Sequence, residues 1–360
     1  MPGPRPRPEL HSIAAHAAGR SAGVPAEEFT HLLAANENPY DPLPGVLDAA
    51  TAAARRLNRY PDIGCARLIA ALAHTCDLPP TRFAAGAGSV GVIQSLIQAM
   101  AAPGDEVMHA WRSFEAYPVI AKAICGAMPV AVPLTDDGCH DLDAMAERVT
   151  ARTRLIFLCT PNNPTGTAVG RDALAEFLAR VPEDVLVVLD EAYAEFVSDK
   201  DAADGLTVCR EHPNVAVVRT FSKAFGLAGL RIGFAVAPEA VAAALRTMAP
   251  YGVSRIGQEA AIASLAATDD VMKRVDLVVA ERHRMEDALA ARGFPVARSQ
   301  ANFLWLPLRE RSAEFAGVCA RAGIGVRVLA GDGVRVTVGA RESNDHFLAT
   351  AANFPLEPGR

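Results

Sequence analysis

Short apolar runs alternate with amphipathic stretches along most of this chain. The clearest runs have strand length, are bounded by Gly, Pro and Asp, and cover residues 155–159, 185–189, 215–219 and 232–236. Runs of this kind are typical of strands buried on both faces of a sheet. Helical periodicity falls around and between them, at residues 92–100, 115–124, 141–149 and 171–181. The alternation predicts a three-layer α/β domain whose central sheet is mainly parallel.

The pattern changes after Pro250. A long charged helix is expected over about 269–292, followed by strands at 303–306 and 334–338, with helices near Phe315 and Asn344. Fewer and shorter apolar runs predict a smaller α+β domain. We therefore expect an N-terminal arm over 1–30, a large domain over 31–255 and a small domain over 256–360, with 31–45 able to join either domain.

Composition narrows the class of protein. The chain has 360 residues, 51% of them apolar, and a formal net charge of −6 without a long basic stripe, which disfavours nucleic acid as a partner. No window approaches 18 strongly apolar residues, and the start lacks the apolar core of a secretory signal. The seven cysteines are scattered singly, which indicates reduced thiols without a metal site. These features predict a cytoplasmic enzyme.

One lysine stands out. Lys and Arg together number 35, yet only four of these residues are lysines, at positions 122, 200, 223 and 273. Lys223 alone stands among hydroxyls, aromatics and glycines. A Schiff base with an aldehyde needs an amine that can lose its proton, which guanidinium cannot do. Lys223 is therefore the candidate for a covalent bond to an aldehyde cofactor.

Asp190 and Tyr193 emerge together at the end of the apolar run before Lys223. An anion beside a pyridine nitrogen keeps that nitrogen protonated, which makes the ring an electron sink for a neighbouring carbanion. A lone acid at a strand end is about as often a helix cap as a catalytic group. Asp-x-x-Tyr followed by Ser-Lys is a much more specific pattern.

A glycine loop, residues 86–91, precedes the helical pattern at 92–100 and matches G-x-G-x-x-G. Its backbone N–H groups are expected to lie at the N-terminus of that helix and to bind a phosphate there. A dinucleotide site is disfavoured, because no clear long strand precedes the loop. Thr220, Ser222 and Arg231 can supply further phosphate contacts. Asn163, in the turn 162–166, is a candidate donor to the cofactor's phenolic oxygen.

At this point the chain resembles the fold-type I pyridoxal-phosphate aminotransferases, in the branch of the histidinol-phosphate and aromatic amino acid enzymes. The resemblance runs from about Leu32 almost to the C-terminus. Its carriers are Asn36-Glu-Asn-Pro39, Asn58-Arg-Tyr-Pro61, Pro161-Asn-Asn-Pro-Thr-Gly166, Asp190-Glu-Ala-Tyr193, Thr220-Phe-Ser-Lys223, Gly229-Leu-Arg231 and Arg335-Val-Thr-Val-Gly339.

The resemblance implies a role for each matching residue. Lys223 would bind pyridoxal 5'-phosphate covalently and move protons, and Asp190 would pair with the ring nitrogen. The remaining cofactor contacts would come from Tyr193 and Asn163 at the ring hydroxyl, Phe114 on the ring face, Gly88, Ser89, Thr220, Ser222 and Arg231 at the phosphate, and Tyr60 at the phosphate of a neighbouring subunit. A homodimer is therefore expected. Asn36, Arg327 and Arg335 are the candidate substrate contacts, with Arg335 for an α-carboxylate.

The implied reaction moves an amino group from an amino acid to a 2-oxo acid. The segments 109–118 and 299–303 look more like the aromatic branch than the histidinol-phosphate branch. Both branches usually carry a tyrosine in the N-terminal arm, but residues 12–26 contain no aromatic residue. Arg327 and Arg335 could equally bind a substrate phosphate, so histidinol phosphate remains the alternative substrate.

Other classes of protein remain open. A pyridoxal-phosphate decarboxylase of amino-acid phosphates shares this scaffold and the lysine but needs no 2-oxo acid. A transcription regulator built on the same scaffold would need a DNA-binding domain, for which the roughly 30 residues before the resemblance are too few. A nicotinamide-dependent dehydrogenase, suggested by residues 86–91, would tolerate loss of Lys223.

Overall fold

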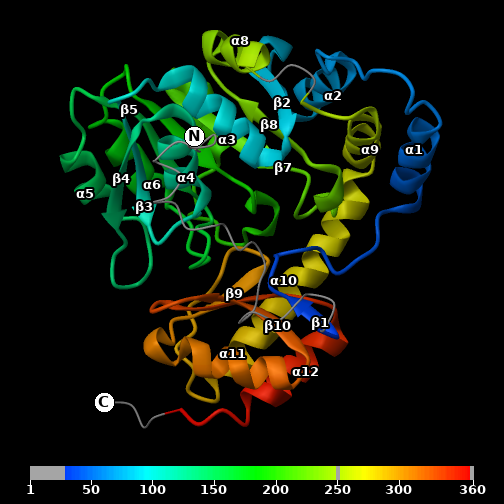
Figure 1. The fold of residues 1–360 in the computed structure, drawn as a ribbon, viewed down its shortest axis with the longest axis vertical. Coiled ribbons are helices and arrows are strands. Elements are labelled where there is room, and N and C mark those ends of the chain that lie inside the picture. Colours follow the sequence, from blue (N-terminus) through cyan, green and yellow to red (C-terminus); the bar gives the residue numbers. More distant parts are fainter. Residues whose placement is uncertain (1–28, 249–251, 357–360) are drawn as a thin grey trace, which may run out of the picture.

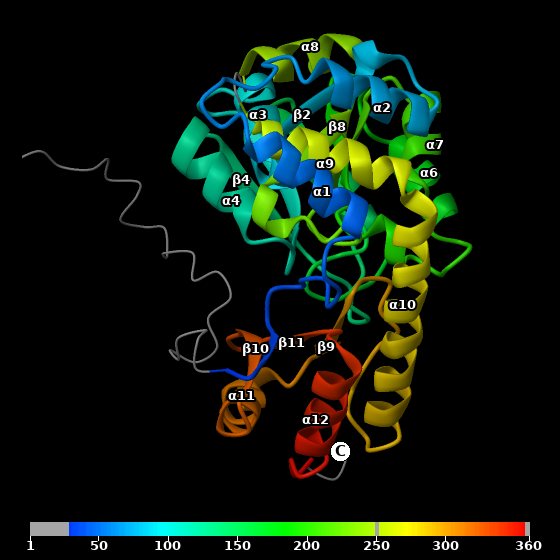
Figure 2. The same ribbon diagram turned by 90° about the vertical axis from the view of Figure 1, so that its right-hand side faces the viewer.

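The computed structural model describes residues 29–248 and 252–356, which form a large and a small domain linked by the long helix α10 (Thr268–Ala290) (Figures 1 and 2). The predicted arm, 1–30, falls almost wholly outside the described residues, and so does its segment without aromatic residues, 12–26. No helix in the described ranges combines the length and the apolar character needed to cross a membrane.

The large domain is built on a seven-stranded sheet with the order β2-β8-β7-β6-β5-β3-β4. The strands are β2 (Phe83–Ala87), β3 (Glu106–Trp111), β4 (Met128–Pro133), β5 (Thr153–Cys159), β6 (Leu186–Asp190), β7 (Val215–Thr220) and β8 (Ile232–Val236). Strands β3 to β7 are mutually parallel. Of these, β5, β6 and β7 are the predicted parallel strands, whereas β3 and β4 were not predicted. The prediction was wrong for β8, which runs antiparallel to both β7 and β2. The intervening segment, 221–231, is too short for the helical crossover that a parallel connection needs.

Helices cover both faces of this sheet, so the domain has the predicted three layers. One face packs against α3 (Gly88–Met100), α4 (Ala116–Ile120) and α8 (Glu239–Met248). The other face packs against α1 (Pro44–Ala54), α2 (Ala66–Cys76), α5 (Leu142–Glu147), α6 (Arg171–Leu178), α7 (Gly205–Glu211) and α9 (Arg255–Ala266). Successive strand residues alternate between the two cores: Ile156 and Leu158 lie in one, Leu155 and Phe157 in the other.

The small domain contains a four-stranded sheet with the order β1-β10-β11-β9. Its strands are β1 (His31–Leu33), β9 (Phe303–Leu306), β10 (Ile324–Leu329) and β11 (Gly333–Thr337), and its helices are α11 (Ser312–Arg321) and α12 (Arg341–Ala351). Strand β1 joins this sheet by pairing parallel with β10. Helix α9, in contrast, buries Ala260 and Ala261 in the core of the large domain. We therefore propose that the domain boundary lies at the start of α10 rather than at residue 256.

Strand β2 corrects one sequence argument. No clear long strand was expected before the glycine loop, yet the five-residue strand β2 includes the first two residues of the loop and leads directly into α3 at Gly88. Its sequence, Phe-Ala-Ala-Gly-Ala, consists mainly of small residues with low strand propensity, so no apolar run marks it. Pairing with β8 along the whole of β2 supplies the stability that its side chains lack.

Candidate active site

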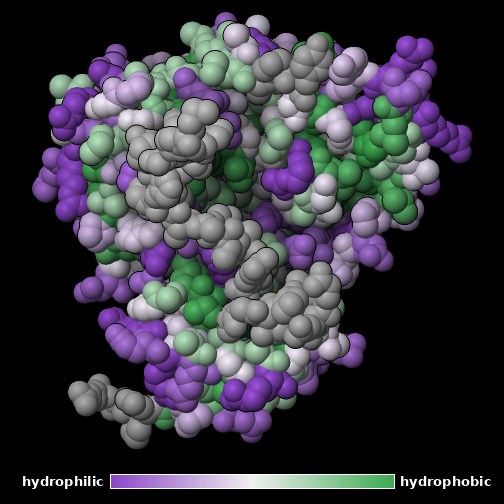
Figure 3. All heavy atoms as spheres, viewed as in Figure 1, coloured by the Kyte–Doolittle hydropathy of each residue, from purple (hydrophilic) through white to green (hydrophobic). Residues whose placement is uncertain are grey.

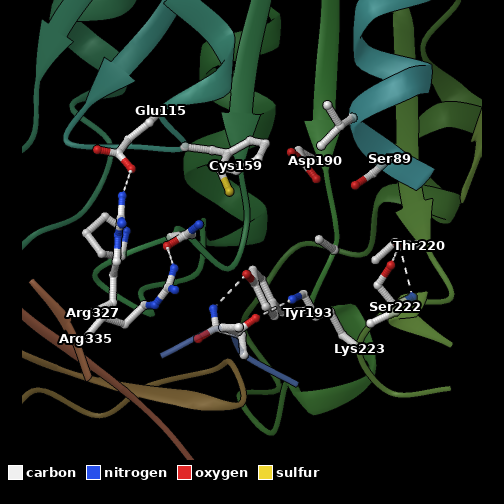
Figure 4. Close-up of a pocket in the computed structure, with 18 of the residues that line it drawn as sticks. Ser89, Glu115, Cys159, Asp190, Tyr193, Thr220, Ser222, Lys223, Arg327 and Arg335 are labelled. Carbon is white, nitrogen blue, oxygen red and sulfur yellow. Dashed lines mark hydrogen bonds and ion pairs between the residues drawn. The ribbon is translucent and has the colours of Figure 1, made fainter. Parts of the chain in front are cut away.

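A cavity of about 320 Å³ lies between the carboxyl ends of the parallel strands and the small domain. Strands β5, β6 and β7 end at this cavity, while β10 and β11 supply its opposite wall (Figure 4). Most of the predicted site residues line it: Asn36, Ser89, Phe114, Asn163, Asp190, Tyr193, Thr220, Ser222, Lys223, Arg231, Arg327 and Arg335. The cavity thus brings together residues that are up to about 300 positions apart in the chain.

Two predicted site residues, Gly88 and Tyr60, are not part of the lining. Gly88 has a positive φ of 72°, and a Cβ there would lie 2.4 Å from Nη2 of Arg231. A glycine at this position therefore lets Arg231 approach the first turn of α3. Tyr60 is 80% exposed on the surface of the large domain. Its predicted role toward a neighbouring subunit stays a prediction.

Lys223 projects into the middle of the cavity from the loop after β7. Its Nζ donates a hydrogen bond to the carbonyl oxygen of Ala35 at 3.0 Å. The amine keeps access to the open cavity, yet protein surrounds it closely enough to disfavour its charge. Burial, and then the positive charge of Arg335, lower the pKa of Lys223 to about 7. A large fraction of this lysine is thus neutral at neutral pH.

Asp190, the last residue of β6, is 3% exposed. Its Oδ2 accepts a hydrogen bond from the hydroxyl of Tyr117 at 2.6 Å, whereas Oδ1 is buried without a hydrogen-bond partner in the described parts of the chain. Burial raises the pKa of this carboxyl to about 6, although the Tyr117 bond acts in the opposite direction. An unpartnered buried carboxylate oxygen is costly, and a protonated ring nitrogen would satisfy it.

Sequence reasoning missed Tyr117. The residue is completely buried and stacks on Phe157 with ring centroids 4.7 Å apart. In the sequence it lies within a predicted helix, where a tyrosine is typical of an ordinary core position. Only the fold, which packs α4 against the carboxyl end of β6, shows that its hydroxyl supports Asp190.

Tyr193 lines the cavity beside Lys223, whose Nζ is 5.9 Å from the centroid of the tyrosine ring. Its hydroxyl accepts a hydrogen bond from Nδ2 of Asn36 at 3.0 Å, and Asn36 is itself held by Oγ1 of Thr337 at 3.1 Å. Burial raises the pKa of Tyr193 to about 12, which keeps the phenol protonated at neutral pH. The phenol can therefore donate its proton to a ligand oxygen in the cavity.

The cavity has an anion-binding end. Oγ1 of Thr220 donates to Oγ of Ser222 at 3.0 Å, and Nη1 of Arg231 reaches the same Ser222 oxygen at 3.3 Å. Ser89 belongs to the first turn of α3, where backbone N–H groups are unpaired within the helix. Figure 4 shows Ser89, Thr220 and Ser222 on the side of the cavity opposite Arg327 and Arg335. These groups can bind a phosphate.

The other end carries the two arginines from the small domain. Nη1 of Arg335 donates to Oδ1 of Asn163 at 2.5 Å, and Nη2 donates to the carbonyl oxygen of Ala34 at 2.7 Å. Nε of Arg335 is buried and has no hydrogen-bond partner in the described chain. Arg327 instead forms an ion pair with Glu115 at 2.7 Å. Sequence reasoning did not single out Glu115.

The lining residues fit the chemistry of pyridoxal phosphate. The phosphate-binding end, the buried Oδ1 of Asp190 and the amine of Lys223 correspond to the phosphate, ring nitrogen and aldehyde of that group. Among the described residues no cluster of three or more His, Cys, Asp or Glu side chains could hold a metal ion. The residues present therefore match the chemistry of this cofactor.

Comparison with known proteins identifies the family. The family "Aminotransferase class I and II" matches residues 31–350. Proteins named aromatic amino acid aminotransferase from Streptomyces coelicolor and Streptomyces avermitilis are 57% and 54% identical, each over 98% of both chains. The crystal structure of histidinol-phosphate aminotransferase from Sinorhizobium meliloti in complex with pyridoxal-5'-phosphate superposes with a TM-score of 0.86, at 28% identity, over 97% of this chain and 96% of that one. The chain belongs to the class I and II aminotransferases.

Proposed function

We propose that this enzyme uses pyridoxal phosphate to move the amino group of an aromatic amino acid to a 2-oxo acid. The observation that carries the proposal is the placement of Lys223 between the phosphate-binding end and the two arginines of one cavity. The names of the relatives at 57% and 54% identity favour an aromatic donor. The chain covers nearly the whole length of both relatives.

The lining residues would hold the cofactor at defined points. Ser89, Thr220, Ser222 and Arg231 would bind its phosphate, and Asp190 would pair with its ring nitrogen. Tyr193 and Asn163 lie where they can reach a ring oxygen. When bound, the cofactor supplies an electron sink for the carbanion that forms at the substrate Cα. Phe114, which lines the cavity next to these groups, would cover the ring face.

Lys223 would carry the proton during the reaction. Because its pKa lies near 7, its amine can both accept the Cα proton and return it near neutral pH. The same lowered pKa would supply the neutral amine that a covalent bond to the cofactor requires. The hydrogen bond from Nζ to Ala35 holds the amine at the centre of the cavity.

Arg335 would bind the substrate α-carboxylate. Its guanidinium has neutral oxygen acceptors in Asn163 and Ala34, and no carboxylate in the described chain forms an ion pair with it. A bidentate arginine–carboxylate pair would fix the orientation of the substrate Cα toward Lys223. Phe114 and Leu329 add apolar lining on which an aromatic side chain can pack.

The test is a spectral titration of the cofactor-loaded enzyme with phenylalanine, tyrosine, histidinol phosphate and glutamate. We expect the visible band of the lysine-linked cofactor to disappear on addition of phenylalanine or tyrosine and to return with a 2-oxo acid. The Lys223→Ala variant should show neither change. A stronger response to histidinol phosphate would favour the alternative substrate. Release of carbon dioxide without a 2-oxo acid would favour a decarboxylase instead.

We also propose a homodimer. Large exposed hydrophobic side chains gather on the segment 44–63, and Figure 3 shows hydrophobic residues on the surface over α1. They include Leu47, Leu57 at 73% exposure, Tyr60 and Ile63. Such a patch favours burial against a second subunit.

We also propose a cytoplasmic location. All seven cysteines are free, which supports it.

A further inference from the structure

Two arginines of the small domain face each other directly. Arg327 on β10 and Arg335 on β11 are register partners in an antiparallel pair, and both side chains line the cavity. Like charges in such a pair repel each other. Burial, and after it the charge of Arg327, lower the pKa of Arg335. The pair therefore needs a counter-charge, or a bound anion, at this end of the cavity.

Glu115 forms an ion pair with only one of them. Its Oε2 accepts a hydrogen bond from Nη2 of Arg327 at 2.7 Å, and both side chains are largely shielded, with 33% and 12% exposure. Figure 4 shows Arg327 extended toward Glu115. Arg335 instead donates a hydrogen bond to Oδ1 of Asn163. One arginine is thus neutralised by the protein and the other remains available for a substrate anion.

The position of Glu115 is fixed by a second arginine. Nη1 of Arg112 lies 3.7 Å from Oε1 of Glu115, and Nε of Arg112 donates a hydrogen bond to Asp332 in the turn between β10 and β11. This network connects the loop after β3 to the small-domain hairpin. Each carboxylate oxygen of Glu115 therefore has an arginine partner.

We propose that Glu115 is a specificity-determining residue that makes the arginine-lined end favour substrates carrying one anionic group over those carrying two. The proposal rests on the proposed function, in which Arg335 binds the α-carboxylate. A neutral aromatic side chain leaves the Glu115–Arg327 pair intact. A second anion at the far end of the substrate must either lie beside Glu115 or displace it from Arg327. Both alternatives weaken binding relative to a site in which Arg327 is uncompensated.

The test measures binding of two acids that cannot react, 3-phenylpropionate and glutarate, to the cofactor-loaded enzyme by calorimetry. Glu115→Gln keeps the shape of the side chain but removes its charge. We expect this variant to bind glutarate at least tenfold more tightly than the wild type, with less than threefold change for 3-phenylpropionate. Unchanged or weaker glutarate binding would overturn the proposal.

Two further variants control the result. Asp332→Asn removes a carboxylate from the same network but leaves the Glu115–Arg327 pair in place, so both acids should bind within threefold of wild type. In the double variant Glu115→Gln with Arg327→Gln the gain for glutarate should disappear. If the gain persists there, glutarate binds elsewhere and the assignment is wrong.

The binding data also separate this inference from the proposed function. Wild-type enzyme that fails to transaminate phenylalanine would refute the proposed function. Wild-type enzyme that is active with phenylalanine, combined with an unchanged preference in Glu115→Gln, would refute only the role of Glu115.

Discussion

Replacing Asp190 by asparagine should stabilise the cofactor-free enzyme. In the wild type the carboxylate is buried, and its Oδ1 has no hydrogen-bond partner in the described chain. Asparagine has nearly the same shape, keeps an oxygen for the Tyr117 hydroxyl and carries no charge. The substitution removes the cost of burying an ion without removing packing.

The magnitude follows from the pKa. Burial raises the pKa of Asp190 from 3.8 to about 6 in the folded state. A raised acid pKa means that stability falls as pH rises from the unfolded value through the folded value. At about 1.4 kcal/mol per unit, the full cost above pH 6 is about 3 kcal/mol, and roughly half of it is present at pH 5.

Urea unfolding of both proteins without cofactor, at pH 5 and pH 8, measures this difference. Asp190→Asn should be more stable by about 1.5 kcal/mol at pH 5 and by about 3 kcal/mol at pH 8. Comparing the two proteins cancels the titration of other groups. With pyridoxal phosphate bound the order should reverse, because only the wild type can pair an anion with the ring nitrogen. A variant that is less stable than wild type at pH 8 without cofactor would refute the reasoning.

Three further predictions concern neighbouring groups. The rate of covalent attachment of pyridoxal phosphate to the cofactor-free enzyme should rise with pH with a midpoint near pH 7, because Lys223 attacks only when neutral. Arg335→Gln should shift this midpoint upward, because it removes a positive charge that lowers the pKa of Lys223. Tyr117→Phe should lower the free energy of unfolding by about 1.5–3 kcal/mol at pH 8, through loss of a hydrogen bond to a charged group, whereas Tyr40→Phe serves as the control with a change below about 0.5 kcal/mol. Gly233→Ala should lower the free energy of unfolding by about 1–3 kcal/mol and weaken cofactor binding, because a Cβ there would lie 2.4 Å from the backbone nitrogen of Ser89. At Gly45 an added Cβ would meet no neighbouring atom within 4 Å, so Gly45→Ala should lower neither the melting temperature nor the cofactor affinity.

The sequence predicted the fold where side chains alone determine the element. Strands β5 to β7 carry uninterrupted apolar runs, and their parallel order follows from helical connections of sufficient length. Strand β2 and the direction of β8 escaped prediction, because small residues and a short connection leave no periodic signal. In those segments the neighbouring strand determines the structure rather than the local sequence.

The candidate site shows the same contrast between residues that the local sequence identifies and residues that only the fold identifies. Lys223 and Asp190 could be singled out because their chemistry is unusual for their surroundings. Tyr117 and Glu115 could not, because each acts through a partner that the fold brings from elsewhere: Asp190 for the tyrosine and Arg327 for the glutamate. Residue type predicts groups that react, whereas support and charge compensation depend on tertiary contacts.

The pairing of β1 with β10 has a consequence for synthesis on the ribosome. The backbone N–H of Asn36, just after β1, bonds to the side chain of Thr337, 301 residues later in the chain. At about 5–20 residues per second, the first strand waits roughly 15–60 s for its partner to be made. The large sheet, complete by Val236, can form during that interval. The segment that contacts Lys223 from the N-terminal side is therefore among the last parts of the site to assemble, so a nascent chain completes its cofactor pocket only after Thr337 has been made.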